Sequence, residues 1–375
     1  MRNRCNSYYY TMNYSEKRKL FEEDNELLSS NPILSTTLSL KSDYTQPVVL
    51  VLTPKTVFYH SVESKASKRG FMITFDTIFQ VIRPKYKPEE KVFGTPTGLR
   101  FICPNYEPME FHSDNPKDIE KWESELKNLM NQFNFHDLFK AEKRLGKGNF
   151  ATVYLGVSLR DQKKVAIKAF GKEATFSQEN GKEALINEIK ITKMFNHPNL
   201  MKLEGVYESE NSIYFALEFV DGNPICGRFN NLSKYTVNER KFIMKGILRG
   251  LAEMARKNVI HRDLKPDNVI LSKEPIIIDF GLATVADDPN YLFVRCGTPG
   301  YVAPEIINIK DMSTKSQPIS DVFSVGCIFY YIIFSKHLFM GKNAQEIIAM
   351  NRECDIVLTG PEFDKLNQKG STSLT

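Results

Sequence analysis

Cysteine is scarce in this chain, with 6 in 375 residues, and no two of them form a CxxC pair or join a cluster of metal ligands. This argues against a disulfide-stapled secreted domain and against the common structural zinc sites. Scattered thiols, some of them inside apolar runs, indicate a reducing compartment. We therefore expect a cytoplasmic location, with recruitment to membrane surfaces as the open alternative.

Long apolar runs and an excess of one charge are also missing. The start, MRNRCNSYYYTMNY, has no apolar core of a signal peptide, and the longest apolar stretch, Val322 to Phe334, is shorter than a bilayer-spanning helix. Lys and Arg number 50 against 45 Asp and Glu, a net charge of +5 that is too small and too dispersed to indicate nucleic-acid binding. We expect no transmembrane segment and no nucleic-acid partner.

Two short motifs carry the chemistry that is present. Residues 261–268 read HRDLKPDN, and residues 279–281 read DFG behind three isoleucines. A base, a metal-binding amide and a metal-binding carboxylate in this order are what phosphoryl transfer needs from a protein. Such a catalyst mainly holds two oxygens in line and neutralises charge with magnesium.

Weaker signals lie upstream. Residues 145–154 read LGKGNFATVY, where missing side chains let a turn close over phosphates, although an ordinary hairpin fits this segment taken alone. Residues 165–168 read VAIK, a strand that ends in an ammonium group able to meet phosphates. Glu188 lies in a helical stretch, residues 182–195, and by itself could be a solvated helix residue.

The full order of glycine loop, VAIK, helix glutamate, HRDLKPDN, DFG and Ala303-Pro304-Glu305 resembles the eukaryotic protein kinase family from about residue 139 to residue 356. The resemblance implies an α+β, bilobal kinase fold over residues 138–375, with a small β-rich lobe and a larger α-helical lobe. It also implies transfer of the γ-phosphate of ATP, with Mg²⁺, to protein substrates. A non-catalytic docking protein with a kinase-like fold is the alternative.

The resemblance assigns roles residue by residue. Asp263 would be the catalytic base with Lys265 beside it, Lys168 and Glu188 would form the ion pair of active kinases, and Asn268 and Asp279 would hold magnesium. Turn capping is the structural alternative for the last two. The implied nucleotide-binding residues are Leu145, Gly146, Gly148, Val153, Ala166, Lys168, the backbones of Glu218 and Val220, and Ile270, with Leu217 as gatekeeper.

Other residues refine the family type. Lys265-Pro266 and Thr298 resemble the serine/threonine kinases, so Ser and Thr hydroxyls are the expected acceptors. Pro224 stands where basophilic kinases carry an acid, so a preference for basic substrates is not supported. Asp321 matches the buried aspartate that holds the catalytic-loop backbone.

The chain also departs from the family pattern. Ala151 replaces the third loop glycine, and Thr192 stands where active kinases place an apolar residue, which is tolerable if its hydroxyl bonds back to the preceding turn. Val294 occupies the usual phosphorylation site, which leaves Tyr291, Thr284 or no phosphate at all as the partner of the HRD arginine, Arg262.

The family continues beyond this chain through two more helices and an arginine that pairs with the glutamate equivalent to Glu305. Nothing in residues 362–375 resembles those helices. We expect Glu305 to be a buried carboxylate without its partner, at a cost of about 3 kcal/mol, and the kinase domain to be C-terminally short and marginally stable.

The first third of the chain predicts a separate region. Residues 1–30 are expected to form a flexible lead. Residues 31–134 predict seven short strands and one amphipathic helix, Pro116 to Phe133, which carries Trp122. This pattern resembles a pleckstrin-homology domain, a small β-barrel plugged by a helix. The predicted strands are residues 33–40, 48–53, 56–61, 71–75, 78–82, 99–103 and 109–112.

Such a domain targets or regulates the kinase through a phosphoinositide or a protein partner. The loop that binds headgroups in lipid-binding members, Lys41 to Pro47, has one lysine opposed by Asp43. The alternative basic residues are Lys65, Lys68 and Arg69, or Arg83, Lys85 and Lys87. Solvated surface lysines explain these residues equally well.

Overall fold

The computed structural model describes residues 31–41, 46–63, 68–84, 94–104, 106–148, 151–226, 235–289, 291–311, 313–360 and 363. The predicted lead and the end of the chain after residue 363 lie outside these ranges. Contacts divide the chain into two compact units, residues 1–182 with 202–219 and residues 183–201 with 220–375. No helix formed by the described residues is both long enough and apolar enough to span a bilayer.

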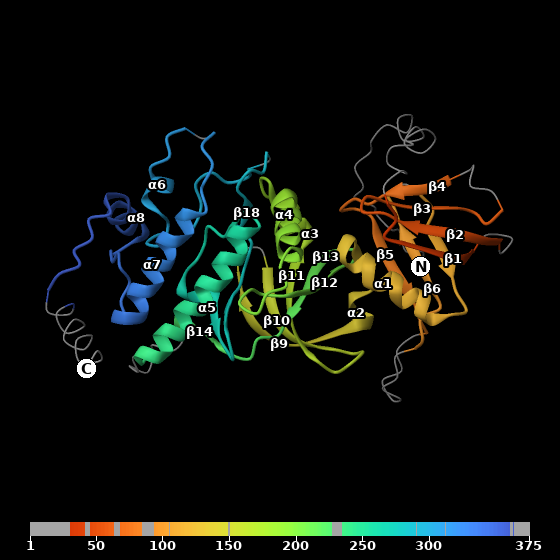
Figure 1. Ribbon diagram of the computed structural model, residues 1–375, viewed down its shortest axis with the longest axis horizontal. Helices are drawn as coiled ribbons and strands as arrows, with labels where there is room; N and C mark the ends of the chain where they lie inside the picture. Colours follow the sequence, from red (N-terminus) through yellow and green to blue (C-terminus); the bar gives the residue numbers. More distant parts are fainter. Residues whose placement is uncertain are drawn as a thin grey trace, which may run out of the picture. The chain divides into compact units, whose positions relative to one another are not determined.

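The first unit begins with antiparallel strands and one helix (Figure 1). The elements are β1 (Leu34–Leu40), β2 (Gln46–Leu52), β3 (Thr56–Ser61), β4 (Lys68–Met72), β5 (Ile78–Ile82), β6 (Gly98–Ile102), β7 (Met109–His112) and α1 (Pro116–Leu129). Three of the predicted strands have the observed bounds. The other four differ by one to three residues at their ends.

Helix α1 forms where its capping and periodicity predict it. Asn115 caps the first turn by accepting a hydrogen bond from Lys117 N at 3.2 Å, and Pro116 occupies the first turn. Ile119, Trp122 and Leu126 face the core and are fully buried. Trp122 packs with the inward residues of β1–β7 in one apolar cluster, so the core-filling role expected of this tryptophan is confirmed.

The prediction that the helix continues to Phe133 is wrong. Met130 is extended, with φ −123° and ψ 162°, and β8 (Asn131–Phe133) follows at once. Strand β8 pairs in parallel with both β5 and β12 (Leu203–Glu208). Backbone pairing on both sides holds these residues in an extended conformation.

The predicted closed barrel is not confirmed. In the described residues the sheet order is β4-β3-β2-β1-β7-β6-β5-β8-β12-β13-β11-β10-β9, which is open because β5 continues onto β8 and does not return to β4. The sheet therefore runs without a break from the N-terminal strands into β9 (Phe139–Lys147), β10 (Ala151–Ser158), β11 (Lys164–Gly171), β12 and β13 (Ser212–Glu218). The short helices α2 (Phe135–Leu138) and α3 (Lys172–Phe176) complete this unit.

The second unit is mainly helical. Its helices are α5 (Val237–Arg256), α6 (Pro304–Ile307), α7 (Ile319–Phe334) and α8 (Ala344–Glu353), together with α4 (Gly181–Lys193), whose first two residues belong to the first unit. Short strands lie between them: β14 (Asn223–Pro224), β15 (Val259–Ile260), β16 (Val269–Leu271), β17 (Pro275–Ile277) and β18 (Thr284–Val285). The mixed α and β content agrees with the predicted α+β kinase fold.

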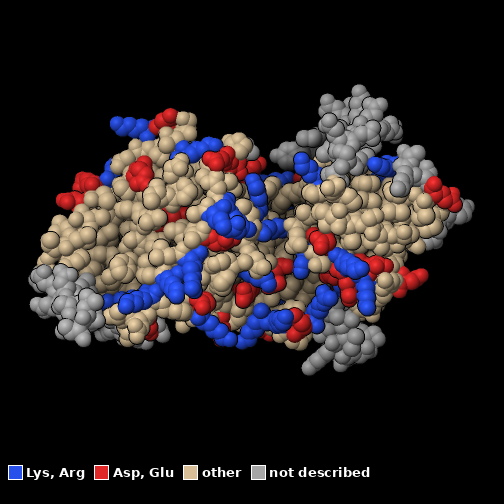
Figure 2. Space-filling view, viewed as in Figure 1, with Lys and Arg blue, Asp and Glu red and all other residues tan. Residues whose placement is uncertain are grey.

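Charged side chains of both signs share the surface. On the face shown in Figure 2, Lys and Arg side chains lie among Asp and Glu side chains. Several are paired, such as Lys41 with Glu110 at 2.9 Å and Lys182 with Asp76 at 2.9 Å. Several surface charges are thus neutralised by a neighbouring charge of opposite sign, in keeping with the small net charge of the chain.

Candidate active site

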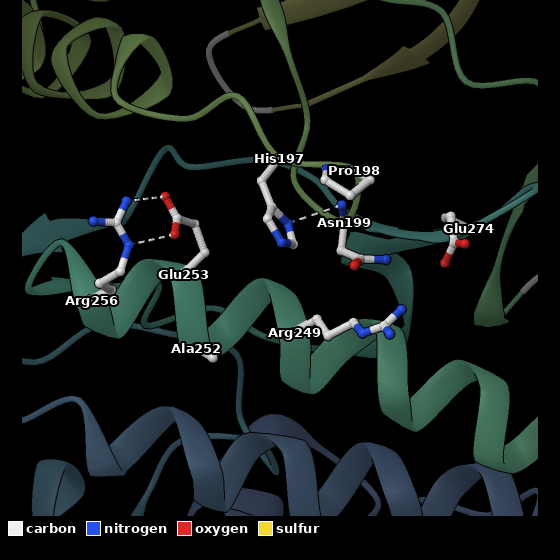
Figure 3. Close-up of a pocket in the computed structure, with 8 residues that line it drawn as sticks. All are labelled: His197, Pro198, Asn199, Arg249, Ala252, Glu253, Arg256 and Glu274. Atoms are coloured by element: carbon white, nitrogen blue, oxygen red, sulfur yellow. Dashed lines mark hydrogen bonds and ion pairs between the residues drawn. The ribbon is translucent and has the colours of Figure 1, made fainter.

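A surface hollow of about 450 Å³ lies in the second unit but contains none of the predicted catalytic residues (Figure 3). Its lining comes from α5, the segment around His197 and Glu274. Glu253 and Arg256, one turn apart on α5, are joined by two hydrogen bonds of 2.8 Å. The predicted base and the predicted metal ligands lie instead in the HRDLKPDN and DFG segments.

Asp321 holds the backbone of the catalytic loop, as predicted. Its carboxylate lies in the first turn of α7, is 1% exposed, and accepts hydrogen bonds from His261 N at 2.7 Å and from Arg262 N at 2.9 Å. Burial raises the pKa of Asp321, while His261 and Arg262 act in the opposite direction. Arg262 has a positive φ of 66°, a backbone conformation that this support maintains.

His261 joins the loop to the DFG segment. Its Nδ1 accepts a hydrogen bond from Asp263 N at 3.2 Å, so Nε2 is the nitrogen that donates to Ile278 O at 3.2 Å. The His261 ring packs against Phe280 at 5.6 Å between centroids, and Phe280 packs against Phe195 at 5.4 Å. The loop and the DFG segment are thereby fixed to each other.

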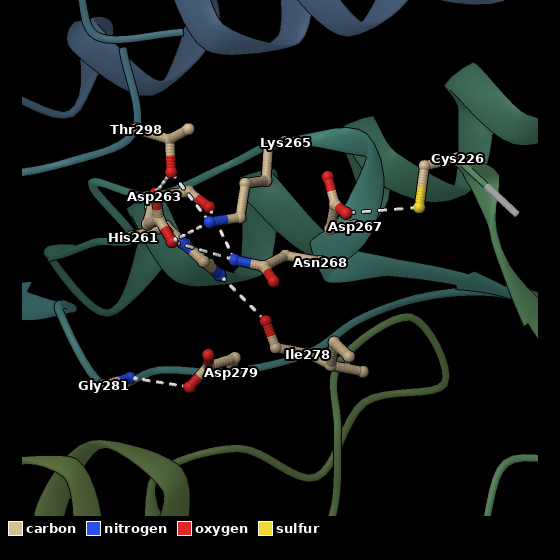
Figure 4. A network of polar contacts seen from close by, with 10 residues as sticks. All are labelled: Cys226, His261, Asp263, Lys265, Asp267, Asn268, Ile278, Asp279, Gly281 and Thr298. Carbon is tan, nitrogen blue, oxygen red and sulfur yellow. Dashed lines mark hydrogen bonds and ion pairs between the residues drawn. The ribbon is translucent and has the colours of Figure 1, made fainter. Parts of the chain in front are cut away.

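Asp263 lies at the centre of a polar network (Figure 4). One carboxylate oxygen accepts from Thr298 Oγ1 at 2.5 Å, and the other accepts from Lys265 Nζ at 2.9 Å and from Asn268 Nδ2 at 3.1 Å. Lys265 also donates to Thr298 Oγ1 at 2.7 Å. The structure therefore brings together the predicted base, its lysine and the threonine of the serine/threonine type.

Asn268 and Asp279 supply oxygen atoms that suit magnesium. Asn268 uses its amide nitrogen on Asp263, at 2.8 Å to the backbone oxygen, so its amide oxygen is the atom able to bind a cation. Asp279 has a positive φ of 64° and accepts a hydrogen bond from Gly281 N at 3.4 Å. Mg²⁺ sites that are completed by substrate phosphates typically use only one or two protein side chains. The described residues contain no cluster of three or more His, Cys, Asp or Glu side chains that could hold a metal ion.

Glu188 and Thr192 lie on the inner face of α4. Glu188 is 7% exposed, and a Cβ atom at Gly281 would lie 3.4 Å from its Oε2, so the carboxylate lies close beside the DFG glycine. Thr192 Oγ1 donates to Glu188 O at 2.6 Å. The expected bond from this hydroxyl back to the preceding turn is confirmed.

Apart from Glu218, the predicted nucleotide-binding residues of the first unit lie on or beside the neighbouring strands β9, β10 and β11. Val153 on β10 is opposite Gly146 on β9 and Lys168 on β11. The turn between β9 and β10 is closed by Gly148 N, which donates to Ala151 O at 2.8 Å. Leu145, beside this turn, is 49% exposed, whereas Ala166 is buried.

One backbone group of Glu218, a residue predicted to contact adenine, is already hydrogen-bonded within the sheet region. Glu218 ends β13, but its backbone N–H donates to Lys202 O at 3.0 Å and is therefore taken. Of its two backbone groups, the carbonyl remains the candidate for the ring edge. Val220 and Ile270 belong to the second unit, with Ile270 in β16 opposite Pro224.

The expectation for Glu305 is wrong. This side chain lies on α6 and is exposed to solvent, because the buried face of the short helix is formed by Ile306. An exposed carboxylate keeps its hydration, so the predicted cost of an unpaired buried charge does not arise.

Some supporting residues could not be recognised from the sequence. Asn351 on α8 is fully buried and bonds to the segment after Thr298, donating to Val302 O at 2.9 Å and accepting from Gly300 N at 3.0 Å. Cys226 Sγ donates to Asp267 Oδ1 at 3.3 Å beside the catalytic loop. Neither residue belongs to a motif, and a side chain's partners far along the chain are not encoded in local spacing.

Comparisons with known proteins agree with this geometry. A family model described as protein kinase domain matches residues 139–372. The chain is 35% identical over 228 residues to "Probable serine/threonine-protein kinase 2" of Plasmodium falciparum, covering 59% of this chain and 42% of that protein. It is 30% identical over 237 residues to human "Calcium/calmodulin-dependent protein kinase type 1B", covering 62% of this chain and 66% of that protein.

A third relative is a "Probable myosin light chain kinase" of Dictyostelium discoideum, 34% identical over 201 residues that cover 52% of this chain and 62% of that protein. The matches to these three proteins span between 42% and 66% of their lengths.

Proposed function

The chain belongs to the protein kinase family, and from this membership we propose that it is an ATP- and magnesium-dependent kinase that phosphorylates Ser and Thr hydroxyls of protein substrates. The observation that carries the proposal is the network at Asp263, in which Lys265, Thr298 and Asn268 all contact one carboxylate. Such a fixed carboxylate can accept the proton of an incoming hydroxyl without moving.

Each residue of the network has a distinct task in this proposal. Asp263 orients the acceptor hydroxyl and takes its proton. Lys265, 2.9 Å from Asp263, keeps a positive charge where the transferred phosphoryl group would carry negative charge. Thr298 fixes the lysine and the carboxylate in one arrangement through bonds of 2.7 and 2.5 Å.

Asn268 and Asp279 would hold magnesium, which supplies charge neutralisation for the phosphates when it is bound. In the first unit, Gly146, Gly148 and Lys168 would contact ATP phosphates, supported by the closed turn at Gly148 and the register of Lys168 opposite Val153. The hydrophobic residues Leu145, Val153, Ala166 and Ile270 would contact adenine, with Glu188 orienting Lys168.

For the N-terminal region we propose a pleckstrin-homology-like fold with a regulatory role toward the kinase domain. Its support is the order of seven strands followed by a helix whose Trp122 fills the core. A cytoplasmic location is part of the proposal, since Cys103, Cys226, Cys296, Cys327 and Cys354 are all free thiols.

Three of the described basic residues are already engaged by other groups, which favours a protein partner over a phosphoinositide, while Arg69 is exposed. Arg83 is 10% exposed and forms an ion pair with Glu123, Lys41 pairs with Glu110, and Lys68 lies over the Phe58 ring at 5.4 Å. Cations already engaged in this way are less available to a headgroup. The predictions for Lys65, Lys85 and Lys87 fall outside the described residues.

Phosphate transfer from labelled ATP to a generic acceptor protein tests the kinase proposal. The full chain should transfer phosphate with magnesium, Asp279→Asn should lose at least about 100-fold in rate, and Asp161→Asn, an exposed turn residue, should match the unmodified chain. A folded chain that binds nucleotide but transfers nothing would support the docking alternative. Flotation with phosphoinositide vesicles at low salt separately tests the lipid partner.

A further inference from the structure

Arg262, the HRD arginine, makes three contacts with the segment that follows the DFG motif. The residue is only 8% exposed. Its Nε donates to Leu282 O at 2.7 Å, and its Nη1 donates to Phe293 O. The guanidinium carbon lies 4.8 Å from the centre of the Tyr291 ring. Two N–H donors of the guanidinium and its central carbon thus contact the segment itself.

Tyr291 is also fixed at its other end. Its hydroxyl accepts a hydrogen bond from Ser316 N at 3.0 Å, and Ser316 is 1% exposed. Next to it, Lys315 Nζ donates to Asp288 O at 3.0 Å. The ring therefore connects Arg262 on one side to the buried residues before α7 on the other.

The alternatives for a phosphate at this arginine are poorly placed. Val294, which stands at the usual phosphorylation site and has no hydroxyl, packs like Val302 and Phe323 on an apolar cluster of Ala303, Ile306 and Ile309. Thr284 lies in β18 and is 3% exposed, so a modifying enzyme could reach it only after local unfolding. The structure orders the segment with contacts that need no phosphate.

We propose that Tyr291 is a positioning residue that acts through Arg262 and takes the place of a phosphorylated side chain, so that the segment is ordered for catalysis without phosphorylation. An aromatic face attracts a guanidinium electrostatically and stacks against its plane. The Tyr291 ring is neutral, so it does not need the charged hydrogen bonds that a phosphate would take from the arginine. The Nε and Nη1 donors of Arg262 accordingly bond to two backbone carbonyls instead. This proposal deepens the regulation of the proposed kinase and depends on it for its kinetic test.

Three substitutions of Tyr291 distinguish the contribution of its aromatic face from that of its apolar volume. Tyr291→Phe keeps the face and loses the bond to Ser316, Tyr291→Leu keeps apolar volume without a π face, and Tyr291→Ala removes both. Tyr330→Leu is the matched control, because Tyr330 lies in α7 with its ring centroid 4.6 Å from that of Phe334 in the same helix.

The kinetic test uses the full chain after phosphatase treatment, with the absence of phosphate verified by mass. The unmodified chain should remain active, and Tyr291→Phe should stay within about twofold of it. Tyr291→Leu and Tyr291→Ala should lose about tenfold in kcat/KM for the protein acceptor, the size expected for a partly desolvated cation–π contact, with KM for ATP nearly unchanged. Tyr330→Leu should match the unmodified chain in these parameters.

Hydrogen exchange at residues 291–296 gives a reading that does not need activity. Exchange should be faster in Tyr291→Leu than in Tyr291→Phe. If the unmodified chain transfers no phosphate, the kinase proposal fails, yet this exchange difference would still support the role of Tyr291. Equal exchange and kinetics in the Phe and Leu variants, or loss of wild-type activity on phosphatase treatment, would overturn the inference.

Discussion

The side-chain amide of Asn131 donates a hydrogen bond to the carboxylate of Glu208 at 3.2 Å, and both residues are buried. The same amide donates to Phe75 O at 3.3 Å, and the other oxygen of Glu208 pairs with Lys172 Nζ at 2.6 Å. Strands β1–β7 are therefore joined to β9–β13 by buried polar contacts as well as by β8. Strands β1–β7 and β9–β13 accordingly belong to one compact unit.

Removing Glu208 should destabilise this connection. Glu208→Ala removes one of the two acceptors of the Asn131 amide and the carboxylate that pairs with Lys172, and we expect a loss of about 2 to 3 kcal/mol in the free energy of unfolding. Glu208→Gln should lose about half of that, since its amide oxygen can still accept from Asn131. Urea denaturation followed by circular dichroism measures both.

Glu204→Gln is the control for this prediction. Glu204 lies on the same strand and pairs with Lys202, but its side chain is 42% exposed, so its loss should cost less than about 0.5 kcal/mol. Equal effects at Glu204 and Glu208 would show that the buried connection contributes nothing beyond ordinary surface charge.

The sequence predicted what local motifs and periodicity determine. The HRDLKPDN and DFG segments lie where they were expected because their spacing encodes the chemistry, and Trp122 is buried because its helix has a clear apolar face. Strand β8 was missed because three residues carry no measurable period. The stacking of Tyr291 on Arg262 and the exposure of Glu305 depend on distant contacts, which the spacing of residues along the chain does not specify.

Acid should weaken the N-terminal strands through Glu110. A hydrogen bond from Lys41, assisted by Arg100, lowers the pKa of Glu110 to about 2. A lowered folded-state pKa means that the stabilisation is complete above about pH 4.5 and is lost as the pH falls toward 2. Both cations are partly exposed, which limits the effect to about 1 kcal/mol.

Glu110→Gln should therefore be less stable than the unmodified chain at pH 7 and should differ little from it near pH 2.5. Melting temperatures of both proteins across this range provide the measurement. A constant difference between them at every pH would exclude the charge of Glu110 as the cause.

An acidic residue at position 294 should inactivate this chain. Val294 packs against the apolar cluster of Ala303, Ile306 and Ile309, so Val294→Asp places a carboxylate against apolar side chains. We expect about 2 kcal/mol of destabilisation and lower activity, whereas Val294→Thr, similar in shape, should retain most of both. Activity above the wild-type level in Val294→Asp would show that Arg262 can release Tyr291 for a negative charge.

Asn351 should be required for the segment that follows Thr298. Gly300 has a φ of 87°, and its N–H and the carbonyl of Val302 are both bonded to the buried Asn351 side chain. Asn351→Ala leaves a buried donor and a buried acceptor unsatisfied, so we expect a loss of about 2 to 3 kcal/mol in unfolding free energy. Because these residues adjoin the Thr298 that contacts Asp263, KM for the protein acceptor should rise more than KM for ATP.

Two further variants test whether the hydrogen bonds or the side-chain volume matter. Asn351→Asp can still accept from Gly300 N but sets an oxygen against Val302 O, so it should be destabilised although its volume is unchanged. Asn308→Ala, at an exposed position after α6, should change the unfolding free energy by less than about 0.5 kcal/mol. Thermal unfolding and acceptor kinetics on the three variants decide between packing and hydrogen bonding. Full stability in Asn351→Asp would assign the role of Asn351 to packing. Parallel losses in the Ala and Asp variants would assign it to the two hydrogen bonds.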